Sequence, residues 1–114
     1  MRPTSAASGQ QMFNTYCAVC HGADGRGGGP AAAALNVSPT DLRDLAKVNG
    51  GKFPEGRVYS VLQFGIETPA HGSKDMPIWG PSLRSLNAGS PMPEMQEHQR
   101  LANLTNYLKS IQEQ

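Results

Sequence analysis

Two cysteines and a histidine stand together in the run Cys17-Ala18-Val19-Cys20-His21, and the chain contains no other cysteine. Side chains three positions apart on a helical turn point to the same side. Both thiols could therefore add to the two vinyl groups on one edge of a single porphyrin. The imidazole of His21 follows directly and could bind the iron as its proximal ligand. The spacing C-x-x-C-H thus predicts one covalently attached c-type haem per chain.

Three other uses of this motif fit the sequence less well. A structural zinc site usually needs four Cys or His ligands, and the remaining histidines, His71 and His98, are distant and not in a paired spacing. A redox-active dithiol is expected in a βαβ context, and the sequence shows no clear run of strands. A simple disulfide between Cys17 and Cys20 would close a very tight loop and leave His21 unexplained.

Segment 22–29, directly after the motif, contains five glycines, at positions 22, 25, 27, 28 and 29. Glycine permits tight turns and close approach of the backbone to a bound group. The rival interpretation is a phosphate-binding loop, but no G-K-[ST] follows and no strand precedes the segment. We therefore interpret it as a loop whose backbone can approach a bound ligand closely.

The second axial ligand of the iron would distinguish a carrier from a catalyst. The candidates are Met12, Met76, Met92, Met95, His71 and His98. Met76 is favoured because Pro77 keeps it out of helical geometry, so that it can present its thioether from an extended loop. The long segment between His21 and Met76 is enough chain to pass around the haem edge.

The other donors have simpler explanations, although Met92, Met95 and His71 stay open as alternatives. Met12 lies on the helix that leads into the motif and suits the core, where methionine fills gaps. His71 stands next to a glycine and suits a surface loop. His98 lies among polar residues of the last helix, where we expect it to be solvated.

Composition predicts one small domain that needs a cofactor to complete its core. The chain has 114 residues, of which 13 are Gly and 9 are Pro, and aromatic side chains make up only 6%. A large, flat apolar group would supply the missing core of such a small domain. The formal net charge of +1 gives no basic surface for nucleic acid, and no apolar run approaches the length of a membrane helix.

The first residues contain no hydrophobic signal region. Haem c is normally attached outside the cytoplasm, so we expect a periplasmic or otherwise extracytoplasmic protein. Either an export signal has been removed, or this is a domain cut from a larger exported protein. We expect a flexible N-terminal tail over residues 1–7 and one domain over residues 8–114.

Hydrophobic spacing predicts an all-α domain. Ser8 and Gln11 form a capping box that opens a helix running into the haem motif, with apolar side chains at Met12, Phe13, Tyr16 and Val19. A second helix should run from Pro54 to a stop at Gly65, and a third should begin near Pro93. Shorter helical pieces are expected at 30–35 and from Pro39, with Leu42 and Leu45 inward, and the Pro- and Gly-rich segment 68–83 is expected to be a loop.

The last helix carries the clearest inward stripe. Leu101, Leu104, Leu108 and Ile111 recur at intervals of three and four residues, which is typical of an amphipathic helix packed on a core.

Taken together, the motifs resemble the class I bacterial mono-haem cytochromes c, from about residue 9 to residue 111. Gly9-x-x-x-Phe13 resembles the contact motif of that family's first helix. Leu104-x-x-Tyr107-Leu108 resembles its partner on the last helix. The resemblance implies a small cytochrome c fold in which helices and loops surround one haem and the N- and C-terminal helices cross.

The resemblance also implies roles for residues around the haem. The Pro30 carbonyl would accept the proton on the far nitrogen of His21, a contact that orients the ring. Met76-Pro77-x-Trp79 resembles the loop of the sixth ligand, with Trp79 near a haem propionate. A second Met-Pro pair, Met92-Pro93, departs from the simplest members and is better explained as the start of the last helix. The lysine-rich face of mitochondrial-type carriers is missing.

The function implied is one-electron transfer through haem c with His21 and Met76 as axial ligands, in a protein that is not an enzyme. Redox proteins would be its partners, and we expect a monomer. One alternative is a cytochrome domain or subunit that passes electrons into a larger respiratory oxidase or dehydrogenase. Another is a five-coordinate peroxidase or gas binder, which requires that Met76 does not bind the iron.

Overall fold

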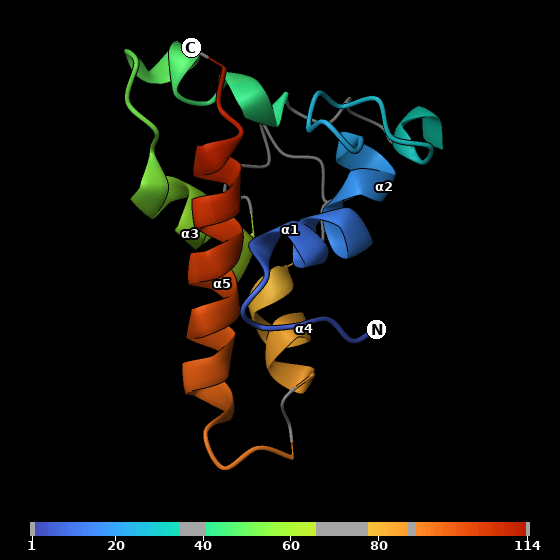
Figure 1. Ribbon diagram of the computed structural model, residues 1–114, viewed down its shortest axis with the longest axis vertical. Coiled ribbons are helices and arrows are strands. Elements are labelled where there is room, and N and C mark those ends of the chain that lie inside the picture. The colour runs from blue at the N-terminus through green and yellow to red at the C-terminus, as the bar shows by residue number, and fades with distance from the viewer. Residues whose placement is uncertain (1, 35–40, 66–77, 87–88, 114) are drawn as a thin grey trace.

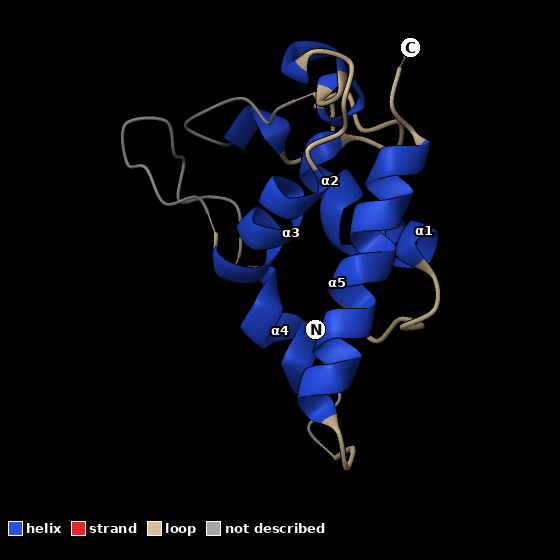
Figure 2. Ribbon diagram, turned by 90° about the vertical axis from the view of Figure 1, so that its left-hand side faces the viewer, coloured by secondary structure: helices blue, strands red, loops and turns tan. Residues whose placement is uncertain are grey.

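The computed structural model describes residues 2–34, 41–65, 78–86 and 89–113, and every regular element in these ranges is a helix (Figure 2). This confirms the all-α fold class. None of the helices within these ranges is both long enough and apolar enough to cross a membrane.

The first helical segment is built from three consecutive pieces: α1 (Gly9–Met12), a π-helical turn (Phe13–Cys17) and α2 (Ala18–His21). The hydroxyl of Ser8 caps the start of α1 by accepting a hydrogen bond from the Gln11 N–H at 3.0 Å. The predicted box is only half formed, because the Gln11 side chain accepts from the backbone N–H of Ser5 at 2.7 Å. Met12 and Phe13 are fully buried, so the predicted place of Met12 in the core is confirmed.

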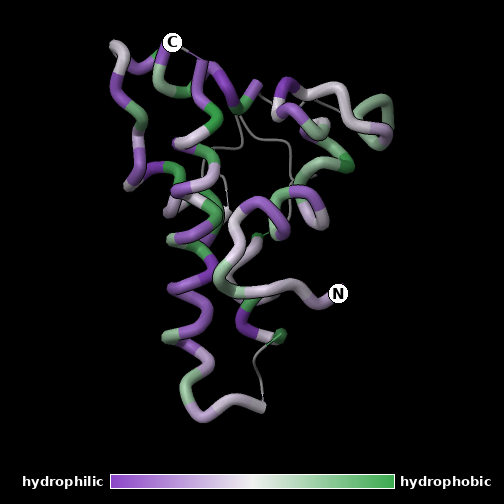
Figure 3. The backbone as a smooth tube through the Cα atoms, viewed as in Figure 1, coloured by the Kyte–Doolittle hydropathy of each residue, from purple (hydrophilic) through white to green (hydrophobic). Residues whose placement is uncertain are grey.

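The long helix α5 (Pro93–Ser110) begins with Pro93 in its first turn, as predicted. Leu101, Leu104 and Leu108 are 0%, 1% and 4% exposed, and Figure 3 shows hydrophobic positions alternating with hydrophilic ones along this helix. The predicted stripe is therefore the side of α5 that faces the core. Ile111 follows the helix and packs partly buried against the same core.

Helices α1 and α5 cross in close contact (Figure 1). A Cβ atom added to Gly9 would lie 2.2 Å from the carbonyl oxygen of Asn103 and 2.8 Å from Cβ of Tyr107. The ring of Phe13 lies 5.3 Å from the ring of Tyr107, tilted by 42°. The crossing of the N- and C-terminal helices that the resemblance implied is confirmed, and the absence of a side chain at Gly9 makes it possible.

Two more helices, α3 (Glu55–Phe64) and α4 (Trp79–Ser85), pack against α5 and against each other. The start and stop of α3 agree with the prediction, because Gly65 ends the helix with φ +84°. The side chain of Leu62 is 3% exposed, and this residue anchors the predicted inward face of α3.

The prediction of a loop over 68–83 is wrong for its last part, where residues 79–83 belong to α4. Pro81 lies in the first turn of α4, where backbone N–H groups have no partner within the helix, so that proline is tolerated. Gly80 is required by packing, because an added Cβ would lie 2.6 Å from the Gln63 carbonyl oxygen on α3. Leu83 on the same helix is fully buried. Gly80 and Pro81 usually mark loops. In α4 the close contact with α3 requires the glycine, and the first turn tolerates the proline.

Among the described residues between α2 and α3 there are short 3₁₀ turns at Ala32–Ala34, Leu42–Asp44 and Lys47–Asn49. Leu42 and Leu45 pack against the core, as predicted. The Gln112 side chain joins this region to the end of α5, because it donates to the Leu42 carbonyl at 2.6 Å and accepts from the Ala46 N–H at 2.9 Å.

The residues before α1 lie along α5 and are hydrogen-bonded to it. Arg100 donates to the carbonyl oxygen of Thr4 at 2.8 Å, and Asn103 donates to that of Ala6 at 2.8 Å. The division of the chain into residues 1–7 and 8–114 stays a prediction.

Candidate haem site

The C-x-x-C-H motif lies on helical backbone, as its spacing requires. Cys17 precedes the first residue of α2, and His21 is its last residue. Cys17 is buried with 9% of its surface exposed, Cys20 is partly exposed, and both are free thiols. The disulfide alternative is therefore not formed in this structure.

A wide helical turn leads into the first cysteine. The backbone N–H of Ala18 donates to the carbonyl oxygen of Phe13, five residues earlier, which is the π-helical pattern. Such single π-turns are rare and occur mostly at functional sites. Here the turn ends at Cys17, so it sets the first thiol relative to the buried ring of Phe13.

The glycine-rich segment is hydrogen-bonded to the backbone of the motif. Gly27 and Gly29 donate to the carbonyl oxygens of His21 and Cys20 at 2.6 and 3.2 Å, and Ala31 donates to that of Val19 at 2.8 Å. These N–H groups would have to face an anion in a phosphate loop. They are used instead to hold the segment against the motif, in agreement with the predicted loop.

The close approach of this segment depends on one glycine. A Cβ atom at Gly29 would lie 2.4 Å from the Val19 carbonyl oxygen and 2.5 Å from that of Ala18. Because both contacts are with backbone, no side-chain rotation could relieve them. Gly29 therefore determines how tightly the loop packs on the motif.

Burial makes the first thiol a weak acid. Loss of water around Cys17, followed by the nearby Cys20, raises the pKa of the Cys17 thiol to about 12 because both effects disfavour the thiolate. At neutral pH Cys17 is a neutral thiol in apolar surroundings. Such surroundings suit an apolar macrocycle bonded at that sulfur.

The residue before the motif contacts the start of α4. The ring of Tyr16 stacks on the ring of Trp79, with centroids 5.5 Å apart and planes inclined by 28°. Tyr16 and Trp79 are 9% and 8% exposed. The structure thus brings Trp79, a predicted site residue, beside the haem motif, and it adds Tyr16, which the sequence pattern marked only as part of an apolar helix face.

The comparison with protein families agrees with this arrangement. The family model described as cytochrome c matches residues 6–112, nearly the whole chain. The chain belongs to the cytochrome c family. Members of this family carry covalent haem c and perform haem-based electron transfer. No curated protein gives a significant match.

The residues of this cytochrome c fit haem c better than they fit a protein-bound metal ion. Two free thiols and a histidine stand at the attachment spacing, and the segment beside them packs closely on their backbone. Within the described ranges, no three His, Cys, Asp or Glu side chains are grouped so that they could hold a metal ion. The zinc alternative therefore gains no support from this part of the chain.

The candidates for the sixth ligand are distributed unevenly. Met76 and His71 lie outside the described residues. Met92 and Met95 are 52% and 60% exposed at the start of α5, at the opposite end of this helix from the side where α2 lies (Figure 1). This position does not favour Met92 or Met95 as ligand.

His98 is exposed on α5, as expected for a solvated side chain. Its Nδ1 atom lies 2.6 Å from the hydroxyl of Tyr59 on α3, so the imidazole is already hydrogen-bonded to that residue. Pro30 is exposed at the end of the glycine-rich segment, and its bond to His21 stays a prediction.

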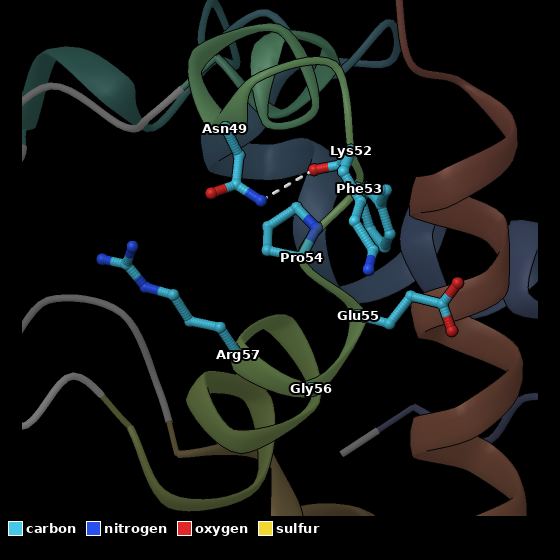
Figure 4. Close-up of a pocket in the computed structure, with 7 residues that line it drawn as sticks. All are labelled: Asn49, Lys52, Phe53, Pro54, Glu55, Gly56 and Arg57. Atoms are coloured by element: carbon cyan, nitrogen blue, oxygen red, sulfur yellow. Dashed lines mark hydrogen bonds between the residues drawn. The ribbon is translucent and has the colours of Figure 1, made fainter.

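A pocket of about 510 Å³, which the sequence analysis did not identify, opens at the start of α3 (Figure 4). It is lined by Asn49, Lys52, Phe53, Pro54, Glu55, Gly56 and Arg57. Glu55 is paired with Lys109 on α5. Lys52 and Arg57 form no ion pair within the described residues, so the pocket has a positive character. Its sequence signature, the run 51–57, was recognised only as the start of a helix.

Proposed function

We propose that this cytochrome c is a one-electron carrier with a single haem c bound covalently to Cys17 and Cys20. His21 and Met76 would be the axial ligands of the iron. The observation that carries the proposal is the C-x-x-C-H motif with two free thiols, in a helix that crosses the C-terminal helix of a cytochrome c domain. Met92 and Met95 are exposed, which makes them less suitable as iron ligands and so supports Met76 as the sixth ligand.

The haem supplies the one-electron chemistry, and the chain supplies its surroundings. In this proposal His21 would bind the iron, and the Pro30 carbonyl would orient the imidazole. Met76 would be the second iron ligand, which would leave no open position for a substrate and would raise the reduction potential. Trp79 would pack near a propionate.

The cellular context belongs to the same proposal. Because haem c is normally attached outside the cytoplasm, we expect the protein in the periplasm or another extracytoplasmic compartment. It would act as a monomer in a respiratory chain and exchange electrons with other redox proteins. The nearly balanced charge, +1 overall, indicates that docking to these partners depends on local surface features and not on net charge.

Covalent attachment is tested by extraction of the purified protein with acidified acetone. The haem should stay with the polypeptide in the parent protein. Replacing both Cys17 and Cys20 by Ala should release any haem that still binds into the organic layer. Release from the parent would overturn the attachment.

The sixth ligand is tested by comparing Met76→Ala with Met92→Ala, which removes an exposed methionine. Met76→Ala should abolish the iron–sulfur charge-transfer band of the ferric spectrum, lower the reduction potential and let the ferrous protein bind carbon monoxide. Met92→Ala should keep the parent spectrum. A band that survives in Met76→Ala would show that another residue binds the iron.

A further inference from the structure

The segment of residues 2–7, which we name the strap, is held by a buried cation. Arg100 on α5 is 5% exposed, and it donates through Nη1 to the Thr4 hydroxyl at 3.0 Å and through Nη2 to the Thr4 carbonyl at 2.8 Å. Burial of a charge is costly unless hydrogen bonds compensate it. Within the described residues Arg100 forms no ion pair, so its charge is compensated there mainly by the strap.

The strap in turn holds the ring of Tyr16. The Tyr16 hydroxyl lies 2.7 Å from the Thr4 hydroxyl and donates to the Arg2 carbonyl at 2.5 Å. Because the Thr4 hydroxyl accepts a hydrogen bond from Arg100, its own O–H can donate to the Tyr16 hydroxyl. Each hydroxyl then donates once and accepts once. The bonds run in one direction, from Arg100 through Thr4 and Tyr16 to Arg2, an arrangement in which neighbouring bonds strengthen one another.

Tyr16 joins this chain of hydrogen bonds to the candidate haem site. It directly precedes Cys17, and its ring stacks on Trp79. Trp79 is the first residue of α4 and stands three positions after Met76. The Tyr16 ring therefore packs on a residue that is close in sequence to the proposed sixth ligand.

We propose that Tyr16, Thr4 and Arg100 are positioning residues of this cytochrome: the strap fixes Tyr16, Tyr16 fixes Trp79, and a fixed Trp79 would restrict the proposed ligand Met76, three positions earlier in the chain. The inference rests on the proposed function because it takes Met76 as the ligand. It assigns to residues 2–7, expected from the sequence to be a flexible tail, a part in ligand retention.

The test uses the haem-loaded full chain and two variants that remove hydroxyl groups. Thr4→Val breaks the link between Arg100 and Tyr16. Tyr16→Phe keeps an aromatic ring against Trp79 but loses both bonds to the strap. The matched control is Thr105→Val, which removes a buried hydroxyl that is bonded to the Leu101 carbonyl of α5 at 2.7 Å and takes no part in the strap.

The readout is the affinity of the ferric protein for imidazole, which competes with the methionine for the iron. Thr4→Val and Tyr16→Phe should each bind imidazole about tenfold more tightly than the parent, because the ligand segment is held less firmly. Thr105→Val should keep the parent's imidazole affinity, even where its denaturant midpoint falls. Parent-like imidazole binding by both strap variants would overturn the proposal and leave the strap a purely structural element.

The failure of the proposed function would be recognised separately, since it appears as a missing iron–sulfur band in the parent. The strap is then tested on Trp79, the only tryptophan in the chain. Its near-ultraviolet circular dichroism should change in Thr4→Val and stay parent-like in Thr105→Val. An unchanged Trp79 signal in Thr4→Val would overturn the link between the strap and α4.

Discussion

The crossing of α1 and α5 leaves no room for even one methyl group at Gly9, so Gly9→Ala should destabilise the protein. The added Cβ would lie 2.2 Å from the carbonyl oxygen of Asn103, 2.9 Å from its carbonyl carbon and 2.8 Å from Cβ of Tyr107, where 3.4–4 Å is an ordinary contact. The helices must separate by about 1 Å to relieve these contacts, which loosens the close packing on which the core depends.

The expected loss of stability follows from two opposing effects. Overpacking of a tight contact costs about 1–3 kcal/mol, and the upper end applies because two of the three nearest atoms are backbone. Alanine is better than glycine in a helix by up to about 1 kcal/mol. The net loss is about 2 kcal/mol, which for a domain of this size lowers the melting temperature by about 8 °C.

Thermal and urea unfolding followed by far-ultraviolet circular dichroism measure this loss. The matched control is Gly56→Ala on α3, where an added Cβ meets no atom within 4 Å. There the better helix propensity acts alone, and the variant should be as stable as the parent or more stable by up to about 1 kcal/mol. If Gly9→Ala matched Gly56→Ala in stability, the close crossing of α1 and α5 would be refuted.

Three further predictions concern the haem motif and the polar groups between α3, α4 and α5. Gly29→Ala should lower the yield of covalently attached haem, measured by haem absorbance per polypeptide, because the new methyl group collides with two carbonyls of the motif. Arg84→Leu should lower the urea midpoint, because it leaves the buried Glu97 carboxylate without its partner at 3.2 Å; replacing Glu97 by Leu as well should restore part of the loss. The pKa of Tyr59 is raised by burial and by Glu97, so the stability that depends on its neutral form is complete below about pH 10 and is lost as the pH rises through the higher folded value. Tyr59→Phe should therefore lose less stability than the parent between pH 9 and pH 11, and equal losses in urea titrations would contradict this.

Local spacing was sufficient to predict the elements that carry strong periodic patterns. The leucine stripe of α5 and the stop at Gly65 follow from residue types a few positions apart, whereas the contact at Gly9 was implied by the family resemblance. The helix α4 could not be predicted in this way. Its Gly80 and Pro81 favour a loop by composition, and only the contact with α3 explains why glycine is needed there.

The contacts around the candidate site could not be predicted from the sequence for a different reason. Arg100 and Thr4 are separated by 96 positions, and the local sequence around either residue does not predict a contact with the other. Tyr16 and Trp79 were each noticed, one as an apolar helix position and one by resemblance, but their stacking depends on how α4 meets the first helical segment. Hydrogen bonds and ring contacts between distant segments emerge only when the packing of the whole domain is known.

The dependence of α1 on α5 also affects the order in which a newly made chain can mature. The first helical segment, from Gly9 to His21, is only marginally stable as an isolated helix, and its packing partner α5 ends only at Ser110. Until residues 93–110 have been synthesised, the segment that carries Cys17 and Cys20 has no α5 to pack against. The motif therefore stays open to enzymes that modify thiols until α5 has been made, and folding encloses it only afterwards.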